Sequence, residues 1–399
     1  MTSWKTYRYT EIADLIGGGT PKTSEPLYWD GDIPWLSVKD FVGDSKYVFS
    51  TEKHITKLGL DNSSTKLLQK DDIIISARGT VGEIAMIPSP MSFNQSCFGI
   101  RANGDLVDPH FLYYYTKTKV NELKGNSHGS VFDTITRATF DNIICSLPPL
   151  AEQRRIAGIL SAIDDKIENN RRINANLELQ AQALYKQWFV DNRSDDWEEK
   201  LLSEIAEFVG GYSYKGNELV ESSSTAMATI KNFERKGGFK VEGFKDIVAS
   251  SKLKAEQHAE LFDILVAHTD LTQNADVIGN AEILLTFGGY TDIIFSMDLV
   301  KVLPKSNFPY KYLLAALLKN PYFKAHCLGY VNGTTVLHMS KKALPEYVVA
   351  CPPNSEAERM DRAFKVYYHK MAEILQENET LASLRDTLLP KLMNGEIKL

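Results

Sequence analysis

Residues 4–18 read WKTYRYTEIADLIGG, and residues 197–211 read WEEKLLSEIAEFVGG. The tryptophan, the Glu-Ile-Ala triplet and the Gly-Gly doublet occupy the same places in both stretches. A Pro-Pro pair follows later in each half, at 148–149 and 352–353, and each pair precedes a long heptad-like stretch. Self-similarity of this kind indicates one structural unit present twice. The sequence therefore predicts a globular module and a long helix, followed by a second copy of both.

Both modules are predicted to mix strands and helices. Short β-rich runs and helical segments recur in the same order in the two halves. The matching segments, first half and then second, are 33–41 and 226–233, 72–76 and 263–267, and 109–118 and 310–319. We divide the chain into a module at 1–146, a long helix at 147–192, a module at 193–350 and a long helix at 351–399. The expected fold class is α+β with a pseudo-two-fold internal repeat.

The first long helix is predicted to begin after Pro149, with Glu152 in its first turn, where a negative charge suits the helix dipole. At 1.5 Å per residue, the run 151–190 would extend about 60 Å. Seven-residue spacing relates the members of two rows, which are Ile156, Ile163, Asn170, Leu177 and Leu184, and Leu160, Ile167, Asn174, Ala181 and Trp188. These are the a and d positions of a coiled-coil seam with two polar interruptions.

The second helix repeats this pattern. Its two rows are Met360, Tyr367, Ile374, Leu381 and Leu388, and Phe364, Met371, Asn378, Arg385 and Leu392. Such a stripe could be core packing against the nearest module, but it is too long for a small module to cover. We therefore expect the helices to pair as an antiparallel coiled coil. Asn170 would meet Asn378 near the middle and fix the register, and Asn174 is the repeat equivalent of Asn378.

Composition narrows the class of protein. The net charge is −6, which argues mildly against nucleic acid binding, although local charge matters more than the sum. The N-terminal residues carry no signal-peptide core and no apolar run reaches the ~18 residues of a membrane helix, so we expect a cytoplasmic protein with no membrane partner. The four cysteines are far apart without C-x-x-C spacing, which favours buried, reduced thiols.

Catalytic signatures are missing from the sequence. The stretch 17–22, GGGTPK, lacks the spacing of a phosphate-binding loop, so a turn is the better interpretation. Asn320-Pro321-Tyr322 is similar to the N-P-P-Y motif of amino-methyltransferases but lacks its second proline, and we interpret it as a helix stop. The eight histidines show no metal-ligand spacing. We find no nucleophile–base constellation, although distant residues could still converge.

Several motifs, in order, resemble the specificity subunits of type I restriction-modification systems. Residues 147–164, LPPLAEQRRIAGILSAID, resemble the opening of that family's conserved helices, and 384–399, LRDTLLPKLMNGEIKL, resemble its C-terminus. Within the modules, EIADLIGGGTPK, IPWLSVKDF and LTQNADVIGNAEIL resemble its target-recognition domains. The second helix departs from the pattern, because Ala357 stands where the family has Gln. We therefore expect weaker partner binding at that end.

The resemblance implies a recognition protein that is not itself an enzyme. Two target-recognition domains would each read half of a bipartite site in double-stranded DNA, and the helix pair would set a spacer of roughly one DNA turn between half-site centres. The family implies no cofactor in this chain. Two modification subunits would use S-adenosylmethionine to methylate adenines, and two restriction subunits would use ATP and Mg. Alternatives are a single-chain DNA methyltransferase or nuclease, and a non-catalytic protein adaptor.

Candidate DNA contacts are loop residues of the types that read bases or bind phosphates. In the first module they are Thr20, Lys22, Lys39, Arg78, Thr80, Asn94, Gln95, His128 and Ser130. In the second they are Tyr214, Lys215, Lys231, His268, Thr269, Asn332, Thr334 and His338. Each could instead be an ordinary solvated or turn residue. Gln153, Arg154 and Arg155 are expected to be exposed on the first helix and to face a partner subunit.

Overall fold

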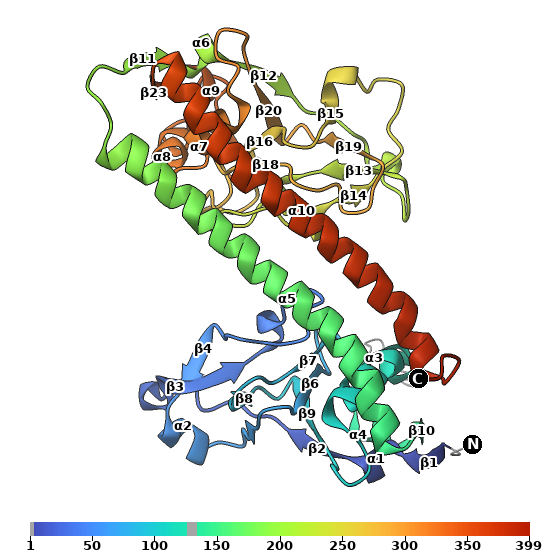
Figure 1. The fold of residues 1–399 in the computed structure, drawn as a ribbon. Coiled ribbons are helices and arrows are strands. Elements are labelled where there is room, and N and C mark those ends of the chain that lie inside the picture. The colour runs from blue at the N-terminus through green and yellow to red at the C-terminus, as the bar shows by residue number, and fades with distance from the viewer. Residues whose placement is uncertain (1–3, 126–133) are drawn as a thin grey trace. The chain divides into compact units, whose positions relative to one another are not determined.

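A computed structural model describes residues 4–125 and 134–399 (Figure 1). The chain forms two compact units. Unit 1 consists of Met1–Asn169 and Thr380–Leu399, and unit 2 consists of Asn170–Glu379. Each unit therefore combines one module with a part of each long helix.

The elements up to the first long helix follow one another in this order: β1 (Lys5–Arg8), α1 (Tyr9–Ile12), β2 (Ala13–Gly17), η1 (Pro26–Tyr28), β3 (Trp29–Leu36), η2 (Val38–Asp40), β4 (Lys53–Ile55), α2 (Lys57–Asp61), β5 (Leu67–Leu68), β6 (Ile73–Ser76), β7 (Ile84–Met86), β8 (Met91–Phe93), β9 (Cys97–Ala102), α3 (Pro109–Gly125), α4 (Arg137–Asp141), β10 (Ile144–Leu147) and α5 (Leu150–Lys186). A π-helical turn, Gln187–Asp191, continues α5.

The elements after that turn are β11 (Glu198–Leu201), α6 (Leu202–Ile205), β12 (Ala206–Gly210), η4 (Gly216–Glu218), β13 (Thr225–Ala228), η5 (Ile230–Asn232), η6 (Val241–Gly243), β14 (Lys245–Asp246), η7 (Ala255–Gln257), β15 (His258–Ala259), β16 (Ile264–Ala267), β17 (Thr269–Asp270), β18 (Ala281–Ile283), β19 (Asp292–Phe295), β20 (Leu299–Pro304), α7 (Lys311–Leu318), α8 (Pro321–Leu328), β21 (Val331–Asn332), β22 (Leu337–Met339), α9 (Ala343–Glu346), β23 (Val348–Cys351) and α10 (Asn354–Met393).

The two four-stranded sheets of one module have the same topology as those of the other, and unit 2 also contains a three-stranded sheet. Unit 1 contains sheets with the strand orders β2-β9-β6-β7 and β4-β3-β8-β5, and unit 2 contains β12-β20-β16-β18 and β14-β13-β19-β15. The pair β3 and β8 is parallel, as is its counterpart β13 and β19. Each module is closed by a strand pair from its two ends, β1 with β10 and β11 with β23. The predicted internal repeat and the α+β class are confirmed.

The β-rich runs are continuous in apolar residues because both faces of their strands are buried. In β6, Ile73 and Ile75 belong to the cluster that contains helix α3, whereas Ile74 packs in the cluster of the other sheet. Strand β16 divides in the same way, with Ile264 in one cluster and Leu265 in another. Each module therefore has two apolar layers separated by one sheet.

The two long helices pair within each unit. In unit 1, Leu160 of α5 shares an apolar cluster with Leu392 of α10, and Arg385 Nη1 donates to Asp164 Oδ1 at 2.9 Å. In unit 2, Asn170 Nδ2 donates to Asn378 Oδ1 at 2.8 Å. Residue numbers fall along α10 as they rise along α5, so the helices are antiparallel, as predicted. The same stripes also pack on the modules, because Leu160 lies in the core cluster that contains strands of unit 1.

Two predictions from composition can be compared with the fold. All four cysteines are free and buried, as expected. No helix within residues 4–125 and 134–399 is both long and apolar enough to cross a bilayer.

Candidate nucleic-acid interface

In unit 1, the loop that follows the Gly-Gly doublet packs on the turn between β8 and β9. The Gly19 amide donates to the Phe93 carbonyl at 3.0 Å, and the Trp35 indole donates to the Gly19 carbonyl at 3.0 Å. One residue further on, the Thr20 hydroxyl donates to the side-chain oxygen of Gln95. Two segments far apart in sequence are thus held against each other at one place on the module.

The turn between β6 and β7 joins the same place. The amides of Ala77 and Arg78 donate to the Ser96 carbonyl at 2.7 and 3.2 Å. Arg78 and Gln95 are exposed, whereas Asn94 is half-buried and accepts from the Ser96 amide at 3.0 Å. The structure therefore brings Arg78, Asn94 and Gln95 together with Thr20. The side-chain oxygen of Asn94 is already used within the turn, where it accepts from the Ser96 amide.

The remaining candidates of unit 1 lie on neighbouring segments or outside the described residues. Lys22 is exposed, and its carbonyl accepts from the Trp29 indole at 3.1 Å. Lys39 is exposed in η2, and Thr80 is exposed in the β6–β7 turn. His128 and Ser130 fall in the range 126–133, outside the described residues.

Unit 2 repeats the arrangement around the turn between β19 and β20. The Tyr212 amide donates to the Phe295 carbonyl at 2.7 Å, and the Met297 amide donates back to the Tyr212 carbonyl at 2.9 Å. Beyond this contact Tyr214 is half-buried, with the Lys245 ammonium 5.7 Å from its ring centroid. Lys215 and Lys231 are exposed in the loop before η4 and in η5.

The other candidates of unit 2 meet on a small antiparallel sheet with the strand order β17-β22-β21. In its register Thr269 pairs with His338, and His338 pairs with Asn332. Asn332, Thr334 and His338 are exposed, and His268 precedes β17 and is half-buried. No pattern in the sequence predicts that these residues, from segments some sixty residues apart, share one sheet.

Thr269 was predicted to contact DNA, but the structure places it in the interior of unit 2. It is only 4% exposed, and its hydroxyl donates to Asp298 Oδ1 at 2.9 Å. A buried hydroxyl engaged in this way positions the β19–β20 turn and does not present itself to a ligand. Thr269 therefore supports the surface on which His338 lies.

His268 lies near two basic side chains, His338 and Lys341, at the edge of this sheet. Burial lowers the pKa of His268, and the nearby His338 and Lys341 lower it further, whereas the Asp298 carboxylate opposes the shift. The neutral imidazole is therefore favoured, with one ring nitrogen as donor and the other as acceptor.

The residues of the turn between β19 and β20 were not among the candidates predicted from the sequence. Met297 is 56% exposed, and Asp298 accepts from Thr269 beside it. The internal repeat offered the signal, because residues 296–298 hold the same place after β19 that 94–96 hold after β8. The two turns share position but not chemistry, as expected if the two modules bind different ligand surfaces.

Gln153 was predicted to be exposed and to face a partner subunit, but it is buried. Its side chain is 1% exposed, accepts from the Asp108 amide at 2.9 Å, and donates to the carbonyls of Leu106 and Pro148 at 3.0 and 2.9 Å. These bonds use both amide donors and the acceptor, so Gln153 fastens the start of α5 to its own module. Arg154 and Arg155 are exposed, as expected.

Ala357 occupies the corresponding place in α10 and is fully buried. The expectation that it weakens partner binding loses its basis, because the position faces the core and not a partner. Unit 2 fastens its helix differently: Asp361 Oδ1 accepts from the amides of Tyr312 and Leu313 at 2.8 and 2.9 Å. The long helix thereby caps the first turn of α7.

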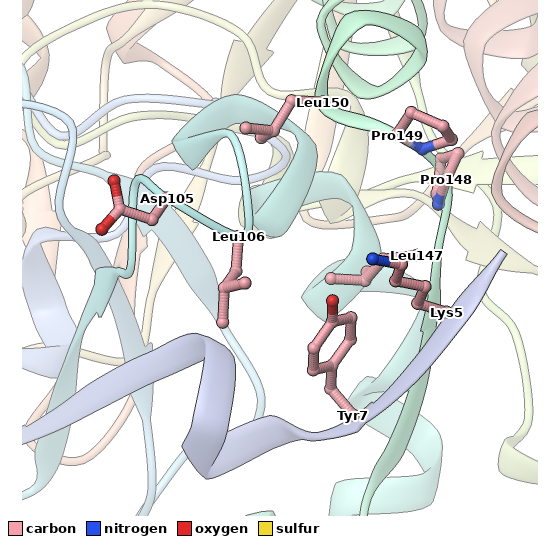
Figure 2. A pocket seen from close by; sticks show the side chains of 8 residues that line it. All are labelled: Lys5, Tyr7, Asp105, Leu106, Leu147, Pro148, Pro149 and Leu150. Carbon is pink, nitrogen blue, oxygen red and sulfur yellow. The ribbon is translucent and has the colours of Figure 1, made fainter.

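A cavity of about 320 Å³ lies where the chain of unit 1 enters α5. Figure 2 shows Tyr7, Leu106 and Leu147 around it, together with the Pro148-Pro149 pair. Lys5 and Asp105 are the charged side chains of its lining. The wall includes Leu106 and Pro148, whose carbonyls Gln153 binds, so the cavity is a by-product of how α5 is attached.

The described residues assemble no metal cluster of three or more His, Cys, Asp or Glu side chains. Asn320 is the N-cap of α8, where its side chain accepts from the amides of Tyr322 and Phe323. Helix α7 ends at Leu318, just before the Asn-Pro-Tyr segment, as expected, and the segment also begins a second helix that we did not expect. The arrangement offers exposed hydrogen-bonding groups on preformed turns, which is chemistry for binding a ligand.

Comparisons with known proteins agree with the duplicated fold. Residues 1–179 match the family model described as "Type I restriction modification DNA specificity domain". The chain is 26% identical over 415 residues to the type I restriction enzyme MjaIX specificity subunit of Methanocaldococcus jannaschii, covering 99% of this chain and 94% of the relative. It is 23% identical over 424 residues to the MjaVIII specificity subunit of the same organism, covering 99% and 93%.

A solved structure shares the fold. The S subunit of a type I restriction-modification system from M. genitalium superposes with a TM-score of 0.56 at 18% identity, covering 98% of this chain and 96% of that one. The fold thus defines a class of duplicated proteins with two modules on an antiparallel helix pair. Within that class, the chain is similar over nearly its whole length to type I specificity subunits, which confirms the resemblance indicated by the motifs.

Proposed function

We propose that the chain is the DNA-recognition subunit of a type I restriction-modification complex. Each unit reads one half of a bipartite site in double-stranded DNA, and α5 with α10 sets the spacer. The duplication carries this proposal, because both units hold the loop after a Gly-Gly doublet against the turn between two matching strands. Two equivalent sets of polar loops on one chain suit a ligand with two separated, dissimilar half-sites.

The chemistry belongs to partner subunits in this proposal. Two modification subunits dock on the chain and use S-adenosylmethionine to methylate adenine, and two restriction subunits use ATP and Mg. Arg154 and Arg155, exposed beside the buried Gln153, are the residues of α5 that we assign to partner contact. The complex acts in the cytoplasm, and the chain itself is not an enzyme.

The test is reconstitution with the neighbouring modification subunit. Methylome sequencing of cells that carry both should show one bipartite motif with methylated adenines, and native mass spectrometry should show two modification subunits per chain. Purified alone, the chain should transfer no methyl groups and bind DNA poorly, given its net charge of −6.

Exchange of a module supplies the control. Replacing residues 1–146 by the corresponding segment of a relative should change one half-site and leave the other. Methylation by the lone chain would instead favour a single-chain methyltransferase, and a complex without sequence preference would favour a protein adaptor.

A further inference from the structure

The hairpin formed by β21, β22 and the turn between them, residues 331–339, separates its side chains by polarity. Leu337 and Met339 are buried in the main cluster of unit 2, and Val331 packs against that cluster. Asn332 and His338 are exposed and are direct cross-strand partners. Thr334 and Thr335 in the turn are also exposed. The outer face of the hairpin is therefore a strip of short hydrogen-bonding side chains over an apolar base.

The hairpin is held in place from several sides. Strand β22 pairs with β17, where His338 lies opposite Thr269. The Met339 amide donates to the His268 carbonyl at 2.9 Å, and Gln273 Nε2 donates to the Thr334 carbonyl at 2.7 Å. Gly333 has φ of +120°, a conformation that L side chains rarely adopt. A binding element built this way loses little conformational entropy when it engages a ligand.

The dimensions and chemistry of this strip fit the major groove of duplex DNA. That groove admits a two-stranded β-ribbon, and its base edges present hydrogen-bond donors and acceptors. Directly opposite residues of an antiparallel pair have Cβ atoms about 5 Å apart, which is near enough for their side chains to reach neighbouring base pairs, stacked ~3.4 Å apart. The Asn332 side-chain amide donates through Nδ2 to the Tyr330 carbonyl at 3.3 Å, which is at the long end for a hydrogen bond.

Charge at the hairpin matches the same ligand. Lys341 and Lys342 are exposed just after β22, next to His338. The nearby Asp298 carboxylate accepts from the Thr269 hydroxyl, and Glu346 accepts from the Tyr330 hydroxyl at 2.6 Å. The exposed lysines suit phosphates beside a groove that the hairpin enters, and Asp298 is the opposing charge nearby.

We propose that the β21–β22 hairpin enters the major groove and that the cross-strand pair Asn332 and His338 reads two adjacent base pairs of the half-site bound by unit 2. Asn332 pairs its amide with an adenine edge, and His338 hydrogen-bonds the neighbouring base. This inference rests on the proposed function and assigns its base readout in unit 2 to two residues.

The experiment uses the complex of the full chain with its modification subunit. Asn332→Ala and His338→Ala are compared with the parent by methylome sequencing and by binding to duplexes that vary at each half-site position. Asn307→Ala is the matched control, an exposed asparagine in the β20–α7 loop. Thermal unfolding of each variant checks that unit 2 is intact.

Each hairpin variant should lose discrimination at one position of one half-site, by roughly ten- to a hundredfold, and leave the other half-site and the spacer unchanged. Asn307→Ala should keep the parent motif. An unchanged motif in the hairpin variants, or a uniform loss of affinity across all sequences, would overturn the assignment while leaving the proposed function standing. Absence of any bipartite motif in the parent complex would instead refute the proposed function.

Discussion

Only one glycine of each Gly-Gly doublet is required by packing. A Cβ at Gly18 would lie 2.0 Å from the Asn94 carbonyl oxygen, and a Cβ at Gly211 would lie 2.0 Å from the Ser296 carbonyl oxygen. At Gly17 and Gly210 a Cβ would meet nothing within 4 Å. The second glycine lets the loop backbone rest directly on the turn that carries candidate contact residues.

The close approach at the second glycine of each doublet predicts a loss of stability on substitution, and the first glycine of the same doublet serves as the control. Gly18→Ala and Gly211→Ala should each lower the free energy of unfolding by about 1–3 kcal/mol, because backbone must move to admit the methyl group. Gly17→Ala and Gly210→Ala should change it little. Urea unfolding of the four variants measures the difference, and equal effects within a doublet would contradict the packing argument.

His268 gives a prediction for pH. Its folded pKa is lowered by burial and by His338 and Lys341, so it lies below the unfolded value of about 6.5. Stability from the neutral imidazole is present above the unfolded pKa and is lost as pH falls through about 6.5 toward the folded pKa. Acidification from about pH 7.5 to 5.5 should therefore lower the melting temperature of the parent more than that of His268→Gln.

The control is His54→Gln, which removes a histidine from unit 1 and should leave the pH dependence of unit 2 as in the parent. Identical acid sensitivity in His268→Gln and the parent would show that other groups dominate. Asp298 opposes the shift of the pKa of His268, so Asp298→Asn should deepen the loss of stability at low pH.

At the scale of elements, the asparagines of the helix seam are not equivalent. Asn170 donates to both Asn378 and Glu377 at 2.8 Å. Asn174 donates to the Met371 carbonyl at 3.2 Å, but its buried side-chain oxygen has no hydrogen-bond partner among the described residues. One polar pair is satisfied and specifies register, whereas the other position carries a desolvation cost.

Asn174→Leu should therefore stabilise the chain by about 1 kcal/mol or more, because it removes an unpaired buried acceptor. Asn170→Leu should destabilise it by a similar amount, since it leaves Asn378 without its partner. Thermal unfolding with both variants side by side measures the contrast. Destabilisation by Asn174→Leu would mean that the register depends on both asparagines.

Elements with periodic sequence could be predicted, and polar burial could not. The runs 72–76 and 263–267 were recognisable because strands buried on both faces are uniformly apolar, and the helices were recognisable from their heptads. The burial of Gln153 and Thr269 depends on Asp108 and Asp298, which are distant in sequence. Hydrogen-bond partners that are distant in sequence cannot be predicted from a local sequence pattern.

The same limit applies to the contacts that fix each module to the helices. Arg385, 3% exposed, binds Asp164, which also accepts from the Tyr114 hydroxyl at 2.5 Å. In unit 2, Lys319, whose side chain is 11% exposed, bridges Glu178 at 3.1 Å and Glu282 at 2.6 Å. Arg385 is a charged residue in an otherwise mostly apolar heptad row, and its ion pair with Asp164 explains why a charge is tolerated there. The sequence also could not show which of the loop candidates share a surface, or that Thr269 among them is buried.

For the whole molecule, the proposed function predicts that helix length sets the DNA spacer. The two units divide at residues 169–170 in α5 and 379–380 in α10. Inserting one heptad at both places should lengthen each helix by about 10 Å, equivalent to about 3 base pairs of spacer. The half-site sequences should stay the same. Methylome sequencing reads the spacing directly, and an unchanged spacer would refute the ruler.

An insertion in α5 alone is the control for that experiment. It would misalign Asp164 with Arg385 or Asn170 with Asn378, so the chain should lose stability instead of recognising a longer site. A stable single-insertion variant with a shifted spacer would show that the helices need not remain in register.

The composition of unit 1 from residues 1–169 and 380–399 has a consequence for synthesis on the ribosome. Translation at ~5–20 residues per second separates Asp164 from its partner Arg385 by roughly 10 to 40 seconds. During that time Ile156 and Leu160 lack the cover of Leu392, whereas unit 2 is contiguous and can close as it emerges. The module made first is therefore finished last. A nascent chain that stalls before Arg385 carries one complete reader and one open core, which marks it for chaperones or proteases.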